Sequence, residues 1–225
     1  MTGKLSENKT ASAVLINILI ASAALFAFGF GVYLTIQADI GAGPWDVFEL
    51  GLSGTFGILY GTASICVSMV ILVIDILLRE PIGIAMFIDA MLVGKAVDLC
   101  NYLGMVKTPK SLVGSIVMML VGLVIMGYAQ YFYMCSALGC GPRDTLLVGL
   151  KRKIRKIPIG LISVVILALV TFAGYLLGGK VGIGTLICAF LSGPIMQFAF
   201  MTMRFDPTGI RHQNLFETVK VLFKR

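Results

Sequence analysis

The segment Gly41-Ala-Gly-Pro-Trp-Asp46 recurs 98 positions later as Gly139-Cys-Gly-Pro-Arg-Asp144, and both copies lie between long apolar segments. A second pair of segments, residues 83–99 and 182–198, matches at an offset of 99. The chain is therefore internally duplicated, with one inserted residue between the two registers. Small membrane transporters are often built in this way, and their functional centre lies where the two halves meet.

The composition places the chain in a membrane. Apolar residues make up 58% of it and charged residues 13%, and its mean hydropathy is +0.98, far above soluble globular usage. The apolar runs are continuous, which predicts helices rather than the alternating strands of a β-barrel. Six runs are long enough to cross a bilayer, which takes about 20 residues. They span residues 13–36, 60–78, 82–103, 111–134, 157–177 and 181–203.

The distribution of Lys and Arg predicts the orientation, because cytoplasmic segments carry an excess of both. With the N-terminus inside, 14 of the 18 basic residues fall on the cytoplasmic side, and only Lys107, Lys110 and Lys180 fall outside. Lys95 is left within a span. This bias predicts that both termini are cytoplasmic. It also explains the net charge of +7 without nucleic acid, for which the chain has no binding motif.

Three spans in each repeat would put the second repeat into the membrane upside down relative to the first. We therefore expect an all-α membrane protein with six transmembrane helices, arranged as two inverted three-helix repeats. The expected organisation is a cytoplasmic segment at 1–12, a first repeat at 13–108, a second repeat at 109–204 and a cytoplasmic amphipathic tail at 205–225. Each repeat carries one further short helix, which begins at its Gly-x-Gly-Pro-x-Asp turn.

The two Gly-x-Gly-Pro-x-Asp turns are the most specific local motif. Glycine allows a tight turn, proline suits the first helical position, and an Asp in the first turn interacts with free N–H groups. Each turn predicts a short helix, at 44–52 and 142–150, which re-enters the membrane or lies at its surface. The turns are either structural caps or gates of a pathway. The residues concerned are Gly41, Gly43, Pro44 and Asp46, and then Gly139, Gly141, Pro142 and Asp144.

Arg143 stands where the first copy of the motif has Trp45, so only the second copy adds a cation to a helix N-terminus. This combination suits an anionic group such as a carboxylate, a sulfonate or a phosphate. The alternative is that Arg143 fixes the topology together with the basic residues that follow at 151–156.

With these motifs, and with Gly182-Ile-Gly-Thr and Gly193-Pro194 in the last span, the sequence resembles the YczE/YyaS/YitT family, also called YczE-like proteins. The resemblance covers almost the whole chain up to Arg204. It implies a multi-pass protein of the bacterial plasma membrane, in a family without a settled activity. One member is associated with lipopeptide or polyketide production, which implies an accessory or export role.

The third span is the polar one, because it carries Asp89, Lys95 and Asp98 among apolar residues. Ionisable groups inside a membrane are costly and usually face a partner or water. Lys95 and Asp98 are three residues apart, so they are expected to pair, either as a structural fastening or as part of a substrate or ion pathway. Asp89 points elsewhere, and its two candidate roles are proton coupling and contact with interfacial water. These three residues and Arg143 form the candidate pathway.

Catalysis is not expected. The single histidine, His212, lies in the tail, so the spans contain no histidine for a metal site or for a Ser-His or Cys-His relay. The five cysteines contain no Cys-x-x-Cys pair, and we expect free thiols, no metal and no cofactor. Apolar residues at helical spacing within 214–225 predict a short helix on anionic lipid, with Asn214 and Glu217 as its cap.

These observations favour a transporter or permease for a small organic solute, with anionic solutes as one candidate class. The runner-up is a non-transporting scaffold or accessory protein for a biosynthetic or export system, and the third interpretation is a passive channel. The expected partners are membrane lipid and a small-molecule solute, not nucleic acid, and a homodimer is a further candidate. Transport requires a polar cavity between the repeats, whereas a scaffold requires only a dry core.

The distribution of charge gives a prediction about topology. In a variant without the native cysteines, Thr108→Cys is expected to react with an impermeant maleimide added to intact cells. A reporter fused after Arg225 is expected to read as cytoplasmic, because the basic residues are concentrated on that side. Labelling of Thr108→Cys only after lysis would reverse the assigned orientation.

Overall fold

The computed structural model describes residues 10–206, 210 and 212–222, and the described chain is all-α. The helices predicted from the sequence are confirmed, and their ends agree within four residues. Parts of the expected N-terminal segment (1–9) and of the tail (207–209, 211 and 223–225) lie outside the described residues. The helices are α1 (Ala11–Gln37), α2 (Pro44–Phe56), α3 (Tyr60–Leu77), α4 (Ile84–Tyr102), α5 (Leu112–Cys135), α6 (Pro142–Lys153), α7 (Ile159–Leu176), α8 (Ile183–Thr202) and α9 (Leu215–Leu222).

Within the described residues, five helices are long and apolar enough to cross a membrane, namely α1, α3, α5, α7 and α8. The sixth expected span, α4, is a helix of 19 residues that is not among these five. Its three charged residues, Asp89, Lys95 and Asp98, make it less apolar than the others. It packs against α1 and α3.

Local sequence explains where several helices begin. Thr10 and Ser111 cap α1 and α5, because each hydroxyl accepts a hydrogen bond from the backbone N–H three residues on, at 3.3 Å and 3.1 Å. The short helices α2 and α6 begin instead with a proline after a glycine N-cap. The turns before them have φ of +105° at Gly41 and +122° at Gly139, which glycine adopts without strain.

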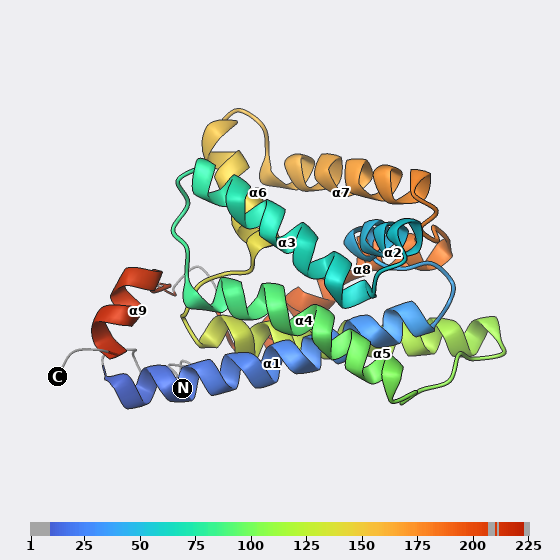
Figure 1. Ribbon diagram of the computed structural model, residues 1–225, viewed down its shortest axis with the longest axis horizontal. Coiled ribbons are helices and arrows are strands. Elements are labelled where there is room, and N and C mark those ends of the chain that lie inside the picture. The colour runs from blue at the N-terminus through green and yellow to red at the C-terminus, as the bar shows by residue number, and fades with distance from the viewer. Residues whose placement is uncertain (1–9, 207–209, 211, 223–225) are drawn as a thin grey trace.

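The centre of the bundle is the contact between α1 and α5, which run along each other (Figure 1). The two backbones approach closely because Gly31 faces Gly122. A Cβ on Gly31 would lie 2.8 Å from the Gly122 carbonyl oxygen, and one on Gly122 would lie 2.7 Å from the Gly31 carbonyl oxygen. On the outer sides of this pair, α4 packs against α1 and α8 packs against α5.

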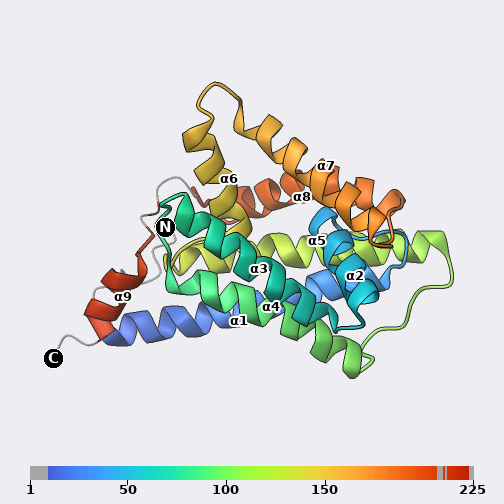
Figure 2. The same cartoon turned by 45° about the horizontal axis from the view of Figure 1, so that its top comes forward.

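The two short helices lie toward opposite ends of the long ones (Figure 1 and Figure 2). Each packs on the same two long helices, because α2 contacts α3 and α7, and α6 also contacts α3 and α7. The start of α1 and the tail helix α9 lie together at one end of the bundle.

The tail helix α9 is docked on the bundle. The predicted cap is confirmed, since the Glu217 N–H donates to Asn214 Oδ1 at 2.8 Å and the Asn214 N–H donates to Glu217 Oε2 at 3.3 Å. The Leu215 N–H donates to the Ile82 carbonyl oxygen at 2.7 Å, and α9 contacts α1. The helix is therefore fixed to protein on one side, while Phe216 is exposed on another.

Two helix crossings that correspond in the sequence differ in the structure. At the α3–α4 crossing, a Cβ on Gly61 would lie 2.5 Å from the Gly94 carbonyl oxygen, and one on Gly94 would lie 2.8 Å from Gly61 Cα. The residues 99 positions later are Gly160 and Gly193, and a Cβ on either would have no other part of the chain within 4 Å. α3 and α4 are closely packed, whereas α7 and α8 stand apart.

This difference predicts unequal effects of the same substitution. We expect Gly61→Ala to destabilise the protein by about 1–3 kcal/mol, because the new Cβ would meet the Gly94 carbonyl oxygen. Gly160→Ala is the matched control and is expected to be neutral or slightly stabilising, since the site is open and alanine favours helix. Thermal unfolding of the purified protein in detergent measures both. Equal losses in the two variants would contradict the difference between the crossings.

Candidate functional site

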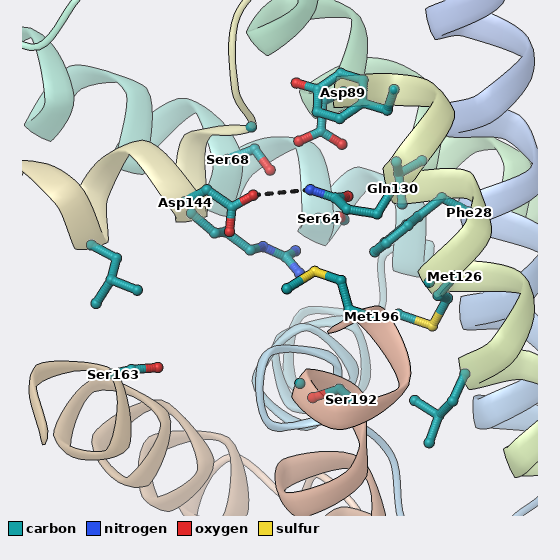
Figure 3. A pocket seen from close by; sticks show the side chains of 18 residues that line it. Phe28, Ser64, Ser68, Asp89, Met126, Gln130, Asp144, Ser163, Ser192 and Met196 are labelled. Carbon is teal, nitrogen blue, oxygen red and sulfur yellow. Dashed lines mark hydrogen bonds between the residues drawn. The ribbon is translucent and has the colours of Figure 1, made fainter. Parts of the chain in front are cut away.

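A cavity of about 370 Å³ lies among the long helices and α6 (Figure 3). Its volume is within the range of sites for small organic molecules. The wall combines apolar, hydroxyl and charged side chains from α1 and from α3 through α8. The lining residues include Phe28, Ser64, Ser68, Asp89, Met126, Gln130, Tyr133, Gly141, Arg143, Asp144, Ser163, Ser192, Gly193 and Met196.

Two carboxylates line the cavity near the start of α6. Asp144, in the first turn of α6, accepts a hydrogen bond from Gln130 Nε2 at 3.2 Å (Figure 3). Asp89 of α4 lies so close to Gly141, the N-cap of α6, that a side chain on Gly141 would collide with its Oδ2. A carboxylate is favourable at this end of a helix. Asp89 has no hydrogen bond or ion pair with any residue that the structure describes.

A tyrosine hydroxyl beside this end of α6 is also unsatisfied. Tyr133 of α5 is only 1% exposed, and its buried hydroxyl has no hydrogen-bond partner among the described atoms. The hydroxyl oxygen lies 4.0 Å from the position of a Cβ on Gly141, the same position that Asp89 crowds. A buried donor without a partner costs about 1–3 kcal/mol. This corner of the cavity therefore has unused hydrogen-bonding capacity.

Arg143 does not offer a free cation to the cavity. Its guanidinium forms an ion pair with Glu49 of α2 and lies over the Trp45 ring, with 5.2 Å from Cζ to the ring centroid. The Glu49 side chain is fully buried. Trp45 and Arg143 hold the same position in the two Gly-x-Gly-Pro-x-Asp segments, so the two motifs meet here. The anion that we expected beside Arg143 is thus already supplied by the protein.

The aspartates of the two motifs have different surroundings. Asp46 is buried, and its Oδ1 accepts a hydrogen bond from the Tyr60 hydroxyl at 2.8 Å. Asp144 is exposed and lines the cavity. The aspartate of the first motif is therefore enclosed by protein, whereas the aspartate of the second motif faces the cavity.

Lys95 and Asp98 do not form the ion pair that we expected, and neither lines the cavity. Lys95 is exposed. Asp98 instead accepts a hydrogen bond from the Gly61 backbone N–H at 2.9 Å, which satisfies a free donor in the first turn of α3. The prediction of a pair was wrong because the neighbouring helix offers Asp98 a nearer donor. Of the four candidate pathway residues, Asp89 and Arg143 line the cavity.

Three residues of the site were missed by sequence reasoning, namely Glu49, Gln130 and Tyr133. Glu49 had an available signal, because it lies one helical turn after Asp46 in a short helix that has no basic residue. Gln130 and Tyr133 belong to no local motif, and only the packing of α5 brings them to the cavity.

The described residues contain no group of three or more His, Cys, Asp or Glu side chains that could hold a metal ion. The five cysteines are free thiols. The side chains that line the cavity can bind a ligand by charge, hydrogen bonds and apolar contact.

The chain is similar to known proteins over most of its length. Residues 15–201 match a family of unknown function, DUF6198. The uncharacterized membrane protein YczE of Bacillus subtilis is 30% identical, over 79% of this chain and 82% of that protein. YyaS of the same organism is 29% identical over 76% and 86%, and an uncharacterized Haemophilus influenzae protein is 26% identical over 78% and 79%. No solved structure is found to match.

The resemblance to YczE and YyaS, which the paired motifs indicated, is confirmed. The protein is accordingly a multi-pass membrane protein with bacterial homologues.

The buried ion pair between the two short helices gives a prediction about stability. Arg143→Gln is expected to cost about 3–5 kcal/mol, because it leaves the Glu49 carboxylate buried and uncompensated. Arg143→Gln combined with Glu49→Gln should recover most of this loss. The control is Lys180→Gln, since the Lys180–Asp39 pair is exposed and is worth about 0–1 kcal/mol. Thermal unfolding measures these three variants and the Glu49→Gln single variant, and additive losses in the double variant would contradict the coupling.

Proposed function

The chain belongs to the DUF6198 family, and we propose that it is a transporter for a small organic solute, built from six spans in two inverted repeats. In this proposal α4 is the sixth span. Asp89 then faces the cavity, Asp98 is hydrogen-bonded to α3, and Lys95 reaches the membrane surface by extending along the helix.

Reciprocal contacts support the two repeats. The Ala85 N–H donates to the Leu138 carbonyl oxygen at 3.2 Å, and the Gly184 N–H donates to the Ile40 carbonyl oxygen at 2.8 Å. These donors are 99 positions apart and these acceptors 98, which are the offsets of the duplicated sequence. Packing of α1 on α4 and of α2 on α7 is matched by packing of α5 on α8 and of α6 on α3. The positions of α2 and α6 toward opposite ends support inversion.

The observation that carries the proposal is the difference between the two glycine crossings. Gly61 and Gly94 are in close backbone contact, whereas Gly160 and Gly193 are open. Packing in this conformation does not require glycine at Gly160 or Gly193, although glycine at 193 also avoids a clash between a Cβ and the ring of Pro194. In a second conformation, the α7–α8 crossing would close and the α3–α4 crossing would open. Gly160 and Gly193 would then make the close contact that Gly61 and Gly94 make here.

Exchange of the two crossings would change the side from which the cavity is reached. Inverted repeats provide such two-sided access without an additional moving domain. In the predicted orientation, Gly61 and Gly94 lie in the outer half of the membrane. In this conformation the cavity is then closed to the outside and open to the cytoplasm between α7 and α8.

Cysteine accessibility tests the proposal without knowledge of the solute. The reporter is Met126→Cys, in a variant whose five native cysteines are replaced by alanine. Met126 lines the cavity from α5, which belongs to neither crossing. Labelling by an impermeant maleimide is measured in intact cells and in inverted membrane vesicles.

Bulky residues at the crossings should shift this labelling. Gly94→Leu forces α3 and α4 apart and is expected to raise labelling from outside by about tenfold. A destabilisation of the closed α3–α4 crossing by a few kcal/mol is enough to reverse the populations of the two conformations. Gly160→Leu prevents closure of α7 on α8 and should restrict labelling to the cytoplasmic side. Gly54→Leu on α2 is the matched control, since its site is open and lies at neither crossing. Identical labelling in all variants favours the scaffold, and simultaneous access from both sides favours a channel.

A further inference from the structure

We infer that the solute bound in this cavity is a small organic cation, a protonated amine held between Asp89 and Asp144. This inference rests on the proposed transporter and adds the class of its substrate. It replaces the anionic solute that the motif around Arg143 suggested.

Both positive features of the site are occupied by side chains of the protein itself. The Arg143 guanidinium is paired with the buried Glu49 carboxylate. The N-terminus of α6, which carries a partial positive charge, has Asp89 against it. An anionic solute would therefore meet no unpaired cation in the described lining of the cavity.

The charge that remains is negative. Asp144 is exposed in the cavity and is bonded only to the neutral amide of Gln130. Asp89 has no hydrogen bond or ion pair within the part of the chain that the structure describes. Two carboxylates in a membrane-embedded cavity repel each other, and a cation between them relieves both the repulsion and the loss of hydration.

An independent observation points to the same corner. The Tyr133 hydroxyl is buried, has no partner and lies beside the start of α6, next to Asp89. A primary ammonium group has three N–H donors. The two carboxylates and the phenolic oxygen together supply three acceptors for them.

The rest of the cavity fits an organic body rather than a bare metal ion. Phe28, Met126 and Met196 line it, and the two methionines lie on the side away from Asp89 (Figure 3). Methionine side chains adapt to apolar groups of different shape. Calcium needs six to eight oxygen ligands, whereas the described residues hold no group of three or more His, Cys, Asp or Glu side chains that could bind a metal ion.

The sign of the charge in the cavity is measured first. The Met126→Cys reporter is treated with two methanethiosulfonate reagents of similar size, one bearing a trimethylammonium group and one a sulfonate. We expect the cationic reagent to react about tenfold faster, relative to the rates of both with a free thiol in solution. Asp89→Asn and Asp144→Asn should each lower this ratio severalfold. Asp39→Asn is the control, because Asp39 is an exposed loop residue outside the cavity.

Binding is measured next, with phenethylamine as the cation and 3-phenylpropionate as an anion of similar size. The purified protein contains one tryptophan, Trp45, which lies against Arg143 at the site, so both its fluorescence and the thermal unfolding midpoint report binding. Phenethylamine should raise the midpoint and 3-phenylpropionate should not. Asp89→Asn and Asp144→Asn should each weaken amine binding by about tenfold, as expected for loss of a charge-assisted hydrogen bond.

Several outcomes would overturn the inference. They are a faster anionic reagent, binding of 3-phenylpropionate alone, no binding of the amine, amine binding that is unchanged in folded Asp89→Asn and Asp144→Asn, or a midpoint shift by sodium chloride in place of the amine. None of these concerns the exchange of the glycine crossings, which the accessibility experiment tests separately. Amine binding without that exchange would instead leave a cation-binding protein that does not transport.

Discussion

Backbone contact between the two halves of the chain is the constraint on which the remaining structure depends. The turn before α2 is held by the start of α8 through Ile40 and Gly184, and the turn before α6 is held by the start of α4 through Leu138 and Ala85. In a membrane, irregular backbone is tolerated only where its polar groups are satisfied by protein or water. Each turn therefore needs the opposite half in order to exist. Side chains at Gly83 or Gly182 would block this contact.

These contacts determine where the charges lie. Because α2 and α6 are each fixed by the other half, Trp45 and Arg143 meet, and Glu49 becomes the partner of Arg143. A buried charge requires a partner, because burial removes its hydration. Once Arg143 is paired in this way, the charged side chains of the cavity without an ion-pair partner among the described residues are Asp89 and Asp144.

The helix pairs α3–α4 and α7–α8, which correspond in the sequence, are packed unequally. α3 is bound to α4 by the glycine contact and by the hydrogen bond from the Gly61 N–H to Asp98. The corresponding positions on α7 and α8 are open, and Ser163, Ser192 and Gly193 from these helices line the cavity. One half of a duplicated chain is thus closed where the other is open. The exchange of conformations that we propose rests on this difference.

The helices and the membrane setting follow from the amino-acid sequence. Continuous apolar runs specify helices because the backbone must satisfy its own hydrogen bonds in lipid, and proline after glycine specifies where α2 and α6 begin. Asp89 and Arg143 were identified from the sequence alone, since an ionisable residue in an apolar run is conspicuous. The local cap of Asn214 and Glu217 was also predictable, because both of its partners lie within one turn.

Which charged side chains are paired and which are unpaired depends on how the helices pack. Lys95 and Asp98 have the spacing of a pair, but the Gly61 N–H on another helix is the partner of Asp98. The sequence around Arg143 predicts an anion site. In the folded protein, Glu49, which is 94 residues away in the chain, lies beside Arg143 and is its anionic partner. Tyr133 and Gln130 carry no motif, and α5 brings them to the cavity by its packing. Electrostatic interaction depends on distance in space, and sequence spacing fixes that distance only within a single helix.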